Sequence, residues 1–295
     1  MTIAACYVSP EGVVLGADST STYGNANGPH YFNHAQKLFE LGERGTLGMV
    51  TWGLGGLGFT SYRRLIALVA DELAAKPPKS VSAVADLWID RFWDAYISSP
   101  SHGPLITTAQ ALSVRPSFNP AGPQAPNART KDEEEEFAVL RQGLFVGFCL
   151  GGYVLPDRTP TAFTIAFDPL AGKPKATQII SGYQFWGAPN MIQRLIFGCD
   201  DELRQAILSS GKWGGTTAEL EAILAQQELA HPIVPIRDAL DFIHACIAST
   251  IKALKFSTFS QICGGPIEIA VITADRPFRW VRHKEWDSAI MEGVS

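Results

Sequence analysis

Hydrophobic residues in this chain gather in short continuous runs rather than in a strict alternation with polar residues. Such runs are typical of strands that are covered on both faces of a sheet. The strands that they predict span residues 2–8, 13–17, 36–41, 46–52, 144–155, 162–168, 175–180, 267–273 and 278–281. Hairpins of this kind are expected to form antiparallel sheets that pack on each other with helices outside. The pattern therefore predicts an α+β protein, a four-layer α-β-β-α sandwich.

Other segments carry apolar residues at every third or fourth position, which is the pattern of an amphipathic helix. Gly198 lies inside one of them and predicts a kink. Thr216 and Glu219 open another with the residues of a capping box. The predicted helices span residues 59–76, 80–98, 189–208, 216–229 and 238–255.

The segment 99–136 follows neither pattern. It contains six prolines and ends in five consecutive acidic residues, 132–136. A long loop is therefore expected here, in which the acidic run starts at most a short helix and otherwise faces solvent. We expect a single domain over residues 1–295, with a Pro-rich and acidic insertion at about 99–137 and a smaller insertion at about 209–236.

Composition and charge narrow the class of protein. Among 295 residues, 46% are hydrophobic and 18% are charged, which suits a globular chain with a large core. The net charge of −5 disfavours a nucleic-acid or anionic-membrane partner. No apolar run approaches the roughly 20 residues of a membrane span. Five scattered cysteines, and no basic residue before Lys37, predict a cytoplasmic protein without a signal peptide.

The chemistry that stands out lies at the start of the chain. Thr2 follows the initiator methionine, and a threonine with a free α-amine carries both a hydroxyl nucleophile and its own general base. Asp18 lies 16 residues later, and Lys37 is the first basic residue. A nearby ammonium lowers the pKa of the amine, which is about 7.7–8.0 in model peptides. The alternative is that Thr2 has no catalytic role and is only a small residue at the start of a strand, with Asp18 and Lys37 as a structural ion pair.

Thr2-Ile3, followed by Gly12-Val13-Val14-Leu15-Gly16-Ala17-Asp18-Ser19, resembles the opening of a proteasome β subunit or of its bacterial peptidase relatives, the N-terminal-nucleophile (Ntn) hydrolases. Residues 36–41 resemble the strand of the family's catalytic lysine, and residues 46–53 its following strand and glycine turn. The resemblance implies the Ntn sandwich fold and a threonine protease or amidase. It also implies a homo-oligomeric ring that acts on a peptide or another amide.

The resemblance further implies supporting residues. Gly53 is expected to donate its backbone N–H to the oxyanion. The family places an aspartate and a serine before a Gly-Gly pair, and here those positions hold Ser260 and Cys263. Ser19 is a further supporting residue, whereas Thr20 replaces the family's arginine. These departures leave two alternatives open: a ring or scaffold subunit with reduced or no activity, or a non-peptidase amidase of the same fold.

Two other motifs are weak. The residues Gly53 to Gly58 satisfy G-x-G-x-x-G, but the next predicted element after the following helix is another helix. The βαβ unit of a dinucleotide site is therefore not expected, and no cofactor is predicted. His30 and His34 have the spacing of metal ligands but no third ligand, so no metal site is predicted either.

Overall fold

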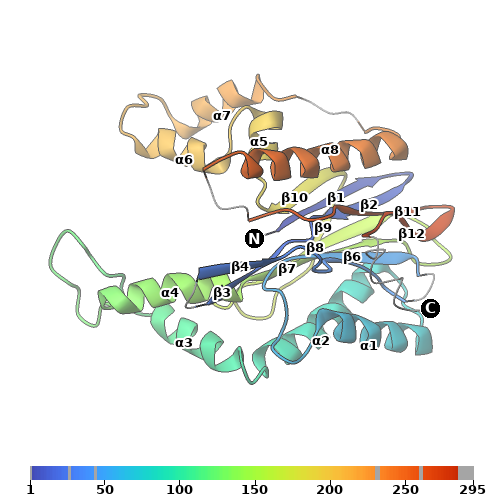
Figure 1. Ribbon diagram of the computed structural model, residues 1–295, viewed down its shortest axis with the longest axis horizontal. Coiled ribbons are helices and arrows are strands. Elements are labelled where there is room, and N and C mark those ends of the chain that lie inside the picture. Colours follow the sequence, from blue (N-terminus) through green and yellow to red (C-terminus); the bar gives the residue numbers. More distant parts are fainter. Residues whose placement is uncertain (1, 26–27, 43–44, 230–232, 259–261, 285–295) are drawn as a thin grey trace. The chain divides into compact units, whose positions relative to one another are not determined.

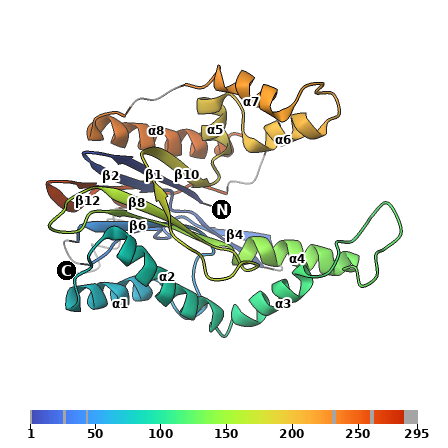
Figure 2. The same ribbon diagram turned by 180° about the vertical axis from the view of Figure 1, so that it is seen from behind.

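The computed structural model describes residues 2–25, 28–42, 45–229, 233–258 and 262–284. Strands and helices are both present, and the chain forms two compact units (Figures 1 and 2). The first unit comprises residues 1–38, 181–273 and 279–295, and the second comprises residues 39–180 and 274–278. The expected α+β class is confirmed at this level. The four-layer stacking, the single domain and the status of the two insertions stay predictions.

The first unit is built on a five-stranded sheet in the order β10-β1-β2-β11-β12. Every residue of β1, β2 and β11 is buried, as their continuous apolar runs predict. β1 pairs antiparallel with both β2 and β10, and β2 pairs antiparallel with β11. The strands are β1 (Ile3–Ser9), β2 (Gly12–Ala17), β10 (Gly182–Gly187), β11 (Glu268–Thr273) and β12 (Arg276–Arg282).

One long helix, α8 (Ile236–Lys255), lies along this sheet and contacts β1, β2 and β11 (Figure 1). Its buried Ile243 and Ile247 approach β2 at Gly16, where an added Cβ would lie 2.8–2.9 Å from their side chains. Glycine at this position therefore allows the helix to pack directly on the sheet. α5 (Asn190–Phe197) packs against α8 in turn.

The helix expected over 189–208 is wrong as a single element. α5 ends at Gly198, whose φ of 76° is left-handed, and α6 (Asp201–Ser209) begins anew with Asp200 as its N-cap. A left-handed glycine ends a helix rather than kinking it. The capping box of Thr216 is confirmed at the start of α7 (Thr217–Ala225).

A two-stranded hairpin between Asp18 and Lys37 was not expected from the sequence. It consists of β3 (Ser21–Asn25) and β4 (Gly28–Phe32), which pair antiparallel with each other. Tyr23 and Phe32 are exposed on it, and their rings meet edge to face at 5.4 Å.

The second unit has its own sheet, in the order β5-β6-β7-β8-β9. The predicted meander of three strands is confirmed as β7, β8 and β9. The helices predicted over 59–76 and 80–98 are present as α1 (Tyr62–Ala75) and α2 (Val81–Ile97), which are slightly shorter than predicted. α2 packs on β7 and β8. The strands are β5 (Leu38–Glu40), β6 (Leu47–Gly53), β7 (Val146–Gly152), β8 (Thr161–Phe167) and β9 (Thr177–Ile179).

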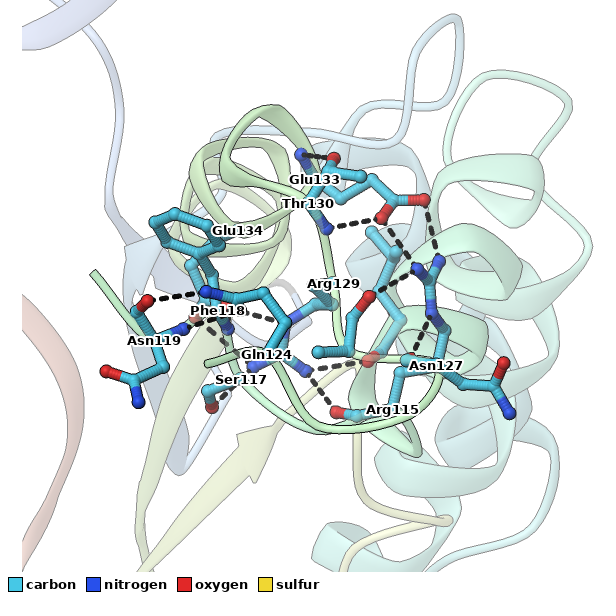
Figure 3. A network of polar contacts seen from close by, with 12 residues as sticks. Arg115, Ser117, Phe118, Asn119, Gln124, Asn127, Arg129, Thr130, Glu133 and Glu134 are labelled. Carbon is cyan, nitrogen blue, oxygen red and sulfur yellow. Dashed lines mark hydrogen bonds and ion pairs between the residues drawn. The ribbon is translucent and has the colours of Figure 1, made fainter. Parts of the chain in front are cut away.

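The segment expected as a long loop contains two helices, α3 (Gly103–Ser113) and α4 (Lys131–Leu144), which contact each other. The turn between them is ordered by the network in Figure 3. Arg115 holds Glu133 through two hydrogen bonds of 2.6 and 2.7 Å, and Arg129 binds Glu134 at 2.8 Å. The expected long loop is therefore wrong, whereas the expected helix start at the acidic run is present as the first turn of α4. The partly buried Arg115 and the buried Arg129 hold Glu133 and Glu134 of this run.

Candidate active site

Asp18 follows directly after β2, and its carboxylate is fully buried. Oδ1 accepts hydrogen bonds from the Ile3 N–H at 3.0 Å and from Lys37 Nζ at 2.6 Å. Oδ2 accepts from the N–H groups of Thr20 at 3.2 Å and Gly264 at 2.9 Å. Four donors from four segments of the chain thus converge on one carboxylate.

Lys37 is 6% exposed and lies just before β5. Its ion pair with Asp18 combines opposite charges with a short hydrogen bond, which is the strong form of the interaction. The backbone ahead of it is fixed as well, because the Ala35 N–H donates to the Ser19 carbonyl at 2.9 Å. The predicted pairing of Asp18 with Lys37 is therefore present in the structure.

Thr2 precedes β1 and is 5% exposed. Its neighbour Ile3 exchanges two hydrogen bonds with Asp18, one to the carboxylate and one from the Asp18 N–H to the Ile3 carbonyl at 3.1 Å. Thr2 is therefore the chain neighbour of the residue that binds Asp18, and Asp18 in turn binds Lys37.

Gly187 is a site residue that the sequence did not single out for this role. It ends β10 opposite Ile3, with a φ of 85°. A Cβ built on it would lie 1.9 Å from the Thr2 carbonyl oxygen. Glycine is therefore required both by the left-handed backbone and by the close approach to Thr2. The resemblance places a supporting serine of the family near Gly187 or Ala188, but it does not predict the contact of Gly187 with Thr2.

The predicted supporting residues have different outcomes. Cys263 is fully buried, and burial, followed by the charge of Asp18, raises the pKa of its thiol to about 12. It is therefore a protonated thiol beside Asp18 rather than a second nucleophile. Ser19 is fully buried, and among the described residues its Oγ has no hydrogen-bond partner. Ser260 lies outside the described residues.

Gly53 belongs to the second unit, where it ends β6 with a φ of 85°. A Cβ there would lie 2.3 Å from the Phe145 carbonyl oxygen, so the turn alone already requires glycine. Its role as the oxyanion donor stays a prediction. The glycine turn leads into α1 and then α2, which is not the order of a βαβ unit.

His30 is one of the two histidines that have the spacing of metal ligands. The His30 ring packs against the Phe32 ring at 4.6 Å on the hairpin. Throughout the part of the chain that the structure describes, no three His, Cys, Asp or Glu side chains gather as metal ligands would. None of the described helices is long and apolar enough to cross a bilayer.

Comparison with known proteins gives matches among solved structures. No family model matches the chain, and no curated protein matches it. Among solved structures, an Anbu Gly-1 mutant from Hyphomicrobium sp. strain MC1 matches with 10% identity and a TM-score of 0.49, over 100% of this chain and 97% of the other. Anbu (ancestral beta-subunit) from Yersinia bercovieri matches with 12% identity and a TM-score of 0.47, over 100% and 95%.

These matches correct the family expected from the sequence. The chain was expected to be a proteasome β-subunit-like Ntn hydrolase, whereas the structures that it is similar to are Anbu proteins, a distinct family. A TM-score below 0.5 carries no argument about the site. The function is therefore argued from the geometry around Asp18.

Proposed function

We propose that this protein hydrolyses amide bonds, in a peptide or another amide, with Thr2 as an N-terminal nucleophile. The observation that carries the proposal is the buried Asp18 carboxylate, which joins the Lys37 ammonium to the backbone of Ile3 next to Thr2. Such a reaction needs a base, a nucleophilic hydroxyl and a positive charge that lowers the pKa of the base, all in one place.

The proposed reaction starts with Thr2 as the first residue of the mature chain. The Lys37 ammonium disfavours a second positive charge, so the free α-amine of Thr2 is available as a base near neutral pH. The amine takes the hydroxyl proton while Thr2 Oγ attacks the amide carbonyl. The protonated α-amine gives this proton to the departing amine as the C–N bond breaks, which leaves an ester on Thr2 Oγ. Water then cleaves the ester, releasing the acid and restoring the Thr2 hydroxyl.

Asp18 supports this assignment more strongly than a purely structural pair would. A buried ion pair is often replaceable by apolar residues at no loss of stability. Here the carboxylate also receives three backbone N–H groups, which fix its position relative to β1. That geometry holds Lys37 to the first residues of the chain.

The test is covalent labelling of Thr2. Intact mass of the protein from its native host is expected to show that Thr2 is the first residue. An electrophilic acylating probe is then expected to modify Thr2, as located by peptide mapping, and to leave a Thr2→Ala variant unmodified. Thr22→Ala, on the hairpin, serves as the matched control and is expected to label normally. A protein that keeps Met1 quantitatively contradicts the proposal.

The second candidate is a scaffold subunit that has little or no turnover. Two observations favour it: Thr2 is only 5% exposed, and Cys263 occupies a position where a hydroxyl was expected. This candidate predicts a folded protein in which Thr2 is not labelled, whether or not Met1 has been removed. The labelling experiment therefore separates the two.

A further inference from the structure

The sheet of the first unit contains a second buried acid that the proposed reaction does not use. Glu268 is the first residue of β11 and is fully buried. Its carboxylate forms ion pairs with His283 Nδ1 at 2.7 Å and with Lys284 Nζ at 3.0 Å. Both basic residues follow β12, the strand next to β11. A buried carboxylate needs partners of this kind. Because a buried ion pair can often be replaced by apolar residues without loss of stability, stability alone does not explain why this pair is present.

The register of the sheet places Glu268 close to the candidate site. Glu268 is opposite Ala17 on β2, and Ala17 is opposite Ala4 on β1. Ala17 directly precedes Asp18, and Ala4 comes two residues after Thr2. Glu268 is thus separated from β1 by two strand spacings, about 10 Å. A charge at this distance inside a protein still acts on a titratable group.

Lys284 makes a second contact that reaches the segment of Lys37. Its Nζ donates to the Ala35 carbonyl at 3.2 Å, and the Ala35 N–H donates to the Ser19 carbonyl at 2.9 Å. Ala35 lies two residues before Lys37. Lys284 therefore links Glu268 on β11 to the backbone that carries Lys37.

We infer that Glu268 and Lys284 are a positioning pair for the Thr2 site. The pair holds the segment that carries Lys37, and its two opposite charges keep the local charge balanced. The inference rests on the proposed function, because it assigns these residues to the Thr2 amine. Among the described residues, Asp18 and Lys37 are the charged pair that binds the backbone of Ile3 next to Thr2, and His283 and Lys284 are the basic residues that pair with Glu268.

Removing the acid and removing the base of this pair are expected to shift the pKa of the Thr2 amine in opposite directions. Glu268→Gln leaves the Lys284 ammonium without its carboxylate, and the added positive field lowers the pKa of the Thr2 amine. Lys284→Met leaves the Glu268 carboxylate in excess, which raises that pKa. Thr2 lies two residues before Ala4, so its backbone and that of Glu268 are roughly 12 Å apart. A unit charge at about this distance, at an effective dielectric constant of about 20, shifts the pKa by about one pH unit.

The experiment is an NMR titration of the Thr2 α-amine in protein that is released from an amino-terminal fusion with Thr2 first. The titration midpoint of Lys284→Met is expected to lie above that of Glu268→Gln by about one to two pH units. Lys284→Arg keeps the charge and is expected to keep the wild-type midpoint. Glu221→Gln, which removes the acid of an exposed ion pair with Arg204, is the matched control for a lost carboxylate.

Coinciding or reversed midpoints of the two variants overturn the inference. Where one single variant does not fold, the other is compared with the wild type: Glu268→Gln must titrate lower, or Lys284→Met higher. The doubly neutral variant must return to the wild-type midpoint, and a shift that persists in it also overturns the pair. The titration needs no turnover, so a wild type that titrates but is never acylated refutes the proposed function alone.

Discussion

At the scale of single residues, the candidate site is a set of backbone donors around Asp18. The sequence pointed to Thr2, Asp18 and Lys37 because their residue types and spacing are those of an N-terminal hydrolase. It could not point to the Gly264 N–H or to the shape of Gly187, because any residue has a backbone N–H and glycine is common. Roles that follow from side-chain type and spacing can be predicted from the sequence, whereas contacts made by backbone groups are seen only in the folded structure.

The first residue-scale prediction concerns Lys37. Lys37→Ala removes the ammonium that lowers the amine pKa, so labelling of Thr2 is expected to be lost in protein that is still folded. The variant also leaves Asp18 buried without its cation, which costs about 3–5 kcal/mol of unfolding free energy. A thermal melt must therefore accompany the labelling. Unchanged labelling in a folded variant removes Lys37 from the mechanism.

The second concerns Gly187. Gly187→Ala places a Cβ against the Thr2 carbonyl oxygen, 1.9 Å away before relaxation, so Thr2 must move. Labelling of Thr2 is expected to fall by at least tenfold. Gly182→Ala is a matched control on the same strand, since its φ of 81° is equally left-handed but nothing lies within 4 Å of its Cβ. Both variants carry the backbone strain, about 1–2 kcal/mol. Equal labelling in the two contradicts the prediction.

At the scale of elements, the sequence predicted those parts that are buried on both faces or strongly amphipathic. Strands β1, β2, β7 and β11 are buried at every residue and mostly apolar, as expected for strands that are covered on both faces. The hairpin of β3 and β4 was missed because Gly24, Pro29 and several polar residues break its pattern. α3 was missed because prolines dominate its surroundings, although Ile106, Ala109 and Leu112 are spaced as one buried helical face.

The third prediction tests how the α3–α4 turn is held. Arg129 is 5% exposed and donates to the carbonyls of Leu112 at 2.7 Å and Arg115 at 2.8 Å (Figure 3). In Arg129→Met the Leu112 carbonyl keeps the Arg115 N–H at 3.2 Å, whereas the Arg115 carbonyl loses the donor that Arg129 supplies. The expected cost is about 1–3 kcal/mol of unfolding free energy. Urea unfolding measures that loss, and limited proteolysis is expected to cut between 117 and 127.

The control for Arg129 is Arg91→Met, which breaks an exposed ion pair with Glu72. Exposed pairs contribute little, so the urea midpoint of this variant is expected to match the wild type. A similar midpoint for Arg129→Met and Arg91→Met would show that the buried hydrogen bonds of the turn do not stabilise the chain.

At the scale of the whole molecule, each of the two units has a sheet, its own helices and its own apolar core. The core of the first unit gathers around Ile3, Val14, Ile243 and Ile269, and that of the second around Trp88, Phe92 and Phe148. The Thr2 cluster is contained in the first unit, because Thr2, Asp18, Lys37, Gly187 and Cys263 all belong to it. The catalytic proposal therefore depends on a single sheet and on the segments that enclose its edge.

The last prediction is that the protein assembles into a closed homo-oligomer, with a ring as the expected form. A hydrolase with an open nucleophile would act on neighbouring proteins, and closed symmetry is the usual way in which identical chains enclose a space. Light scattering at micromolar concentration is expected to give one species of several chains. Thr2→Ala is expected to give the same species, because assembly does not need the nucleophile. A monodisperse monomer whose Thr2 is labelled normally would refute the assembly and leave the hydrolase proposal standing.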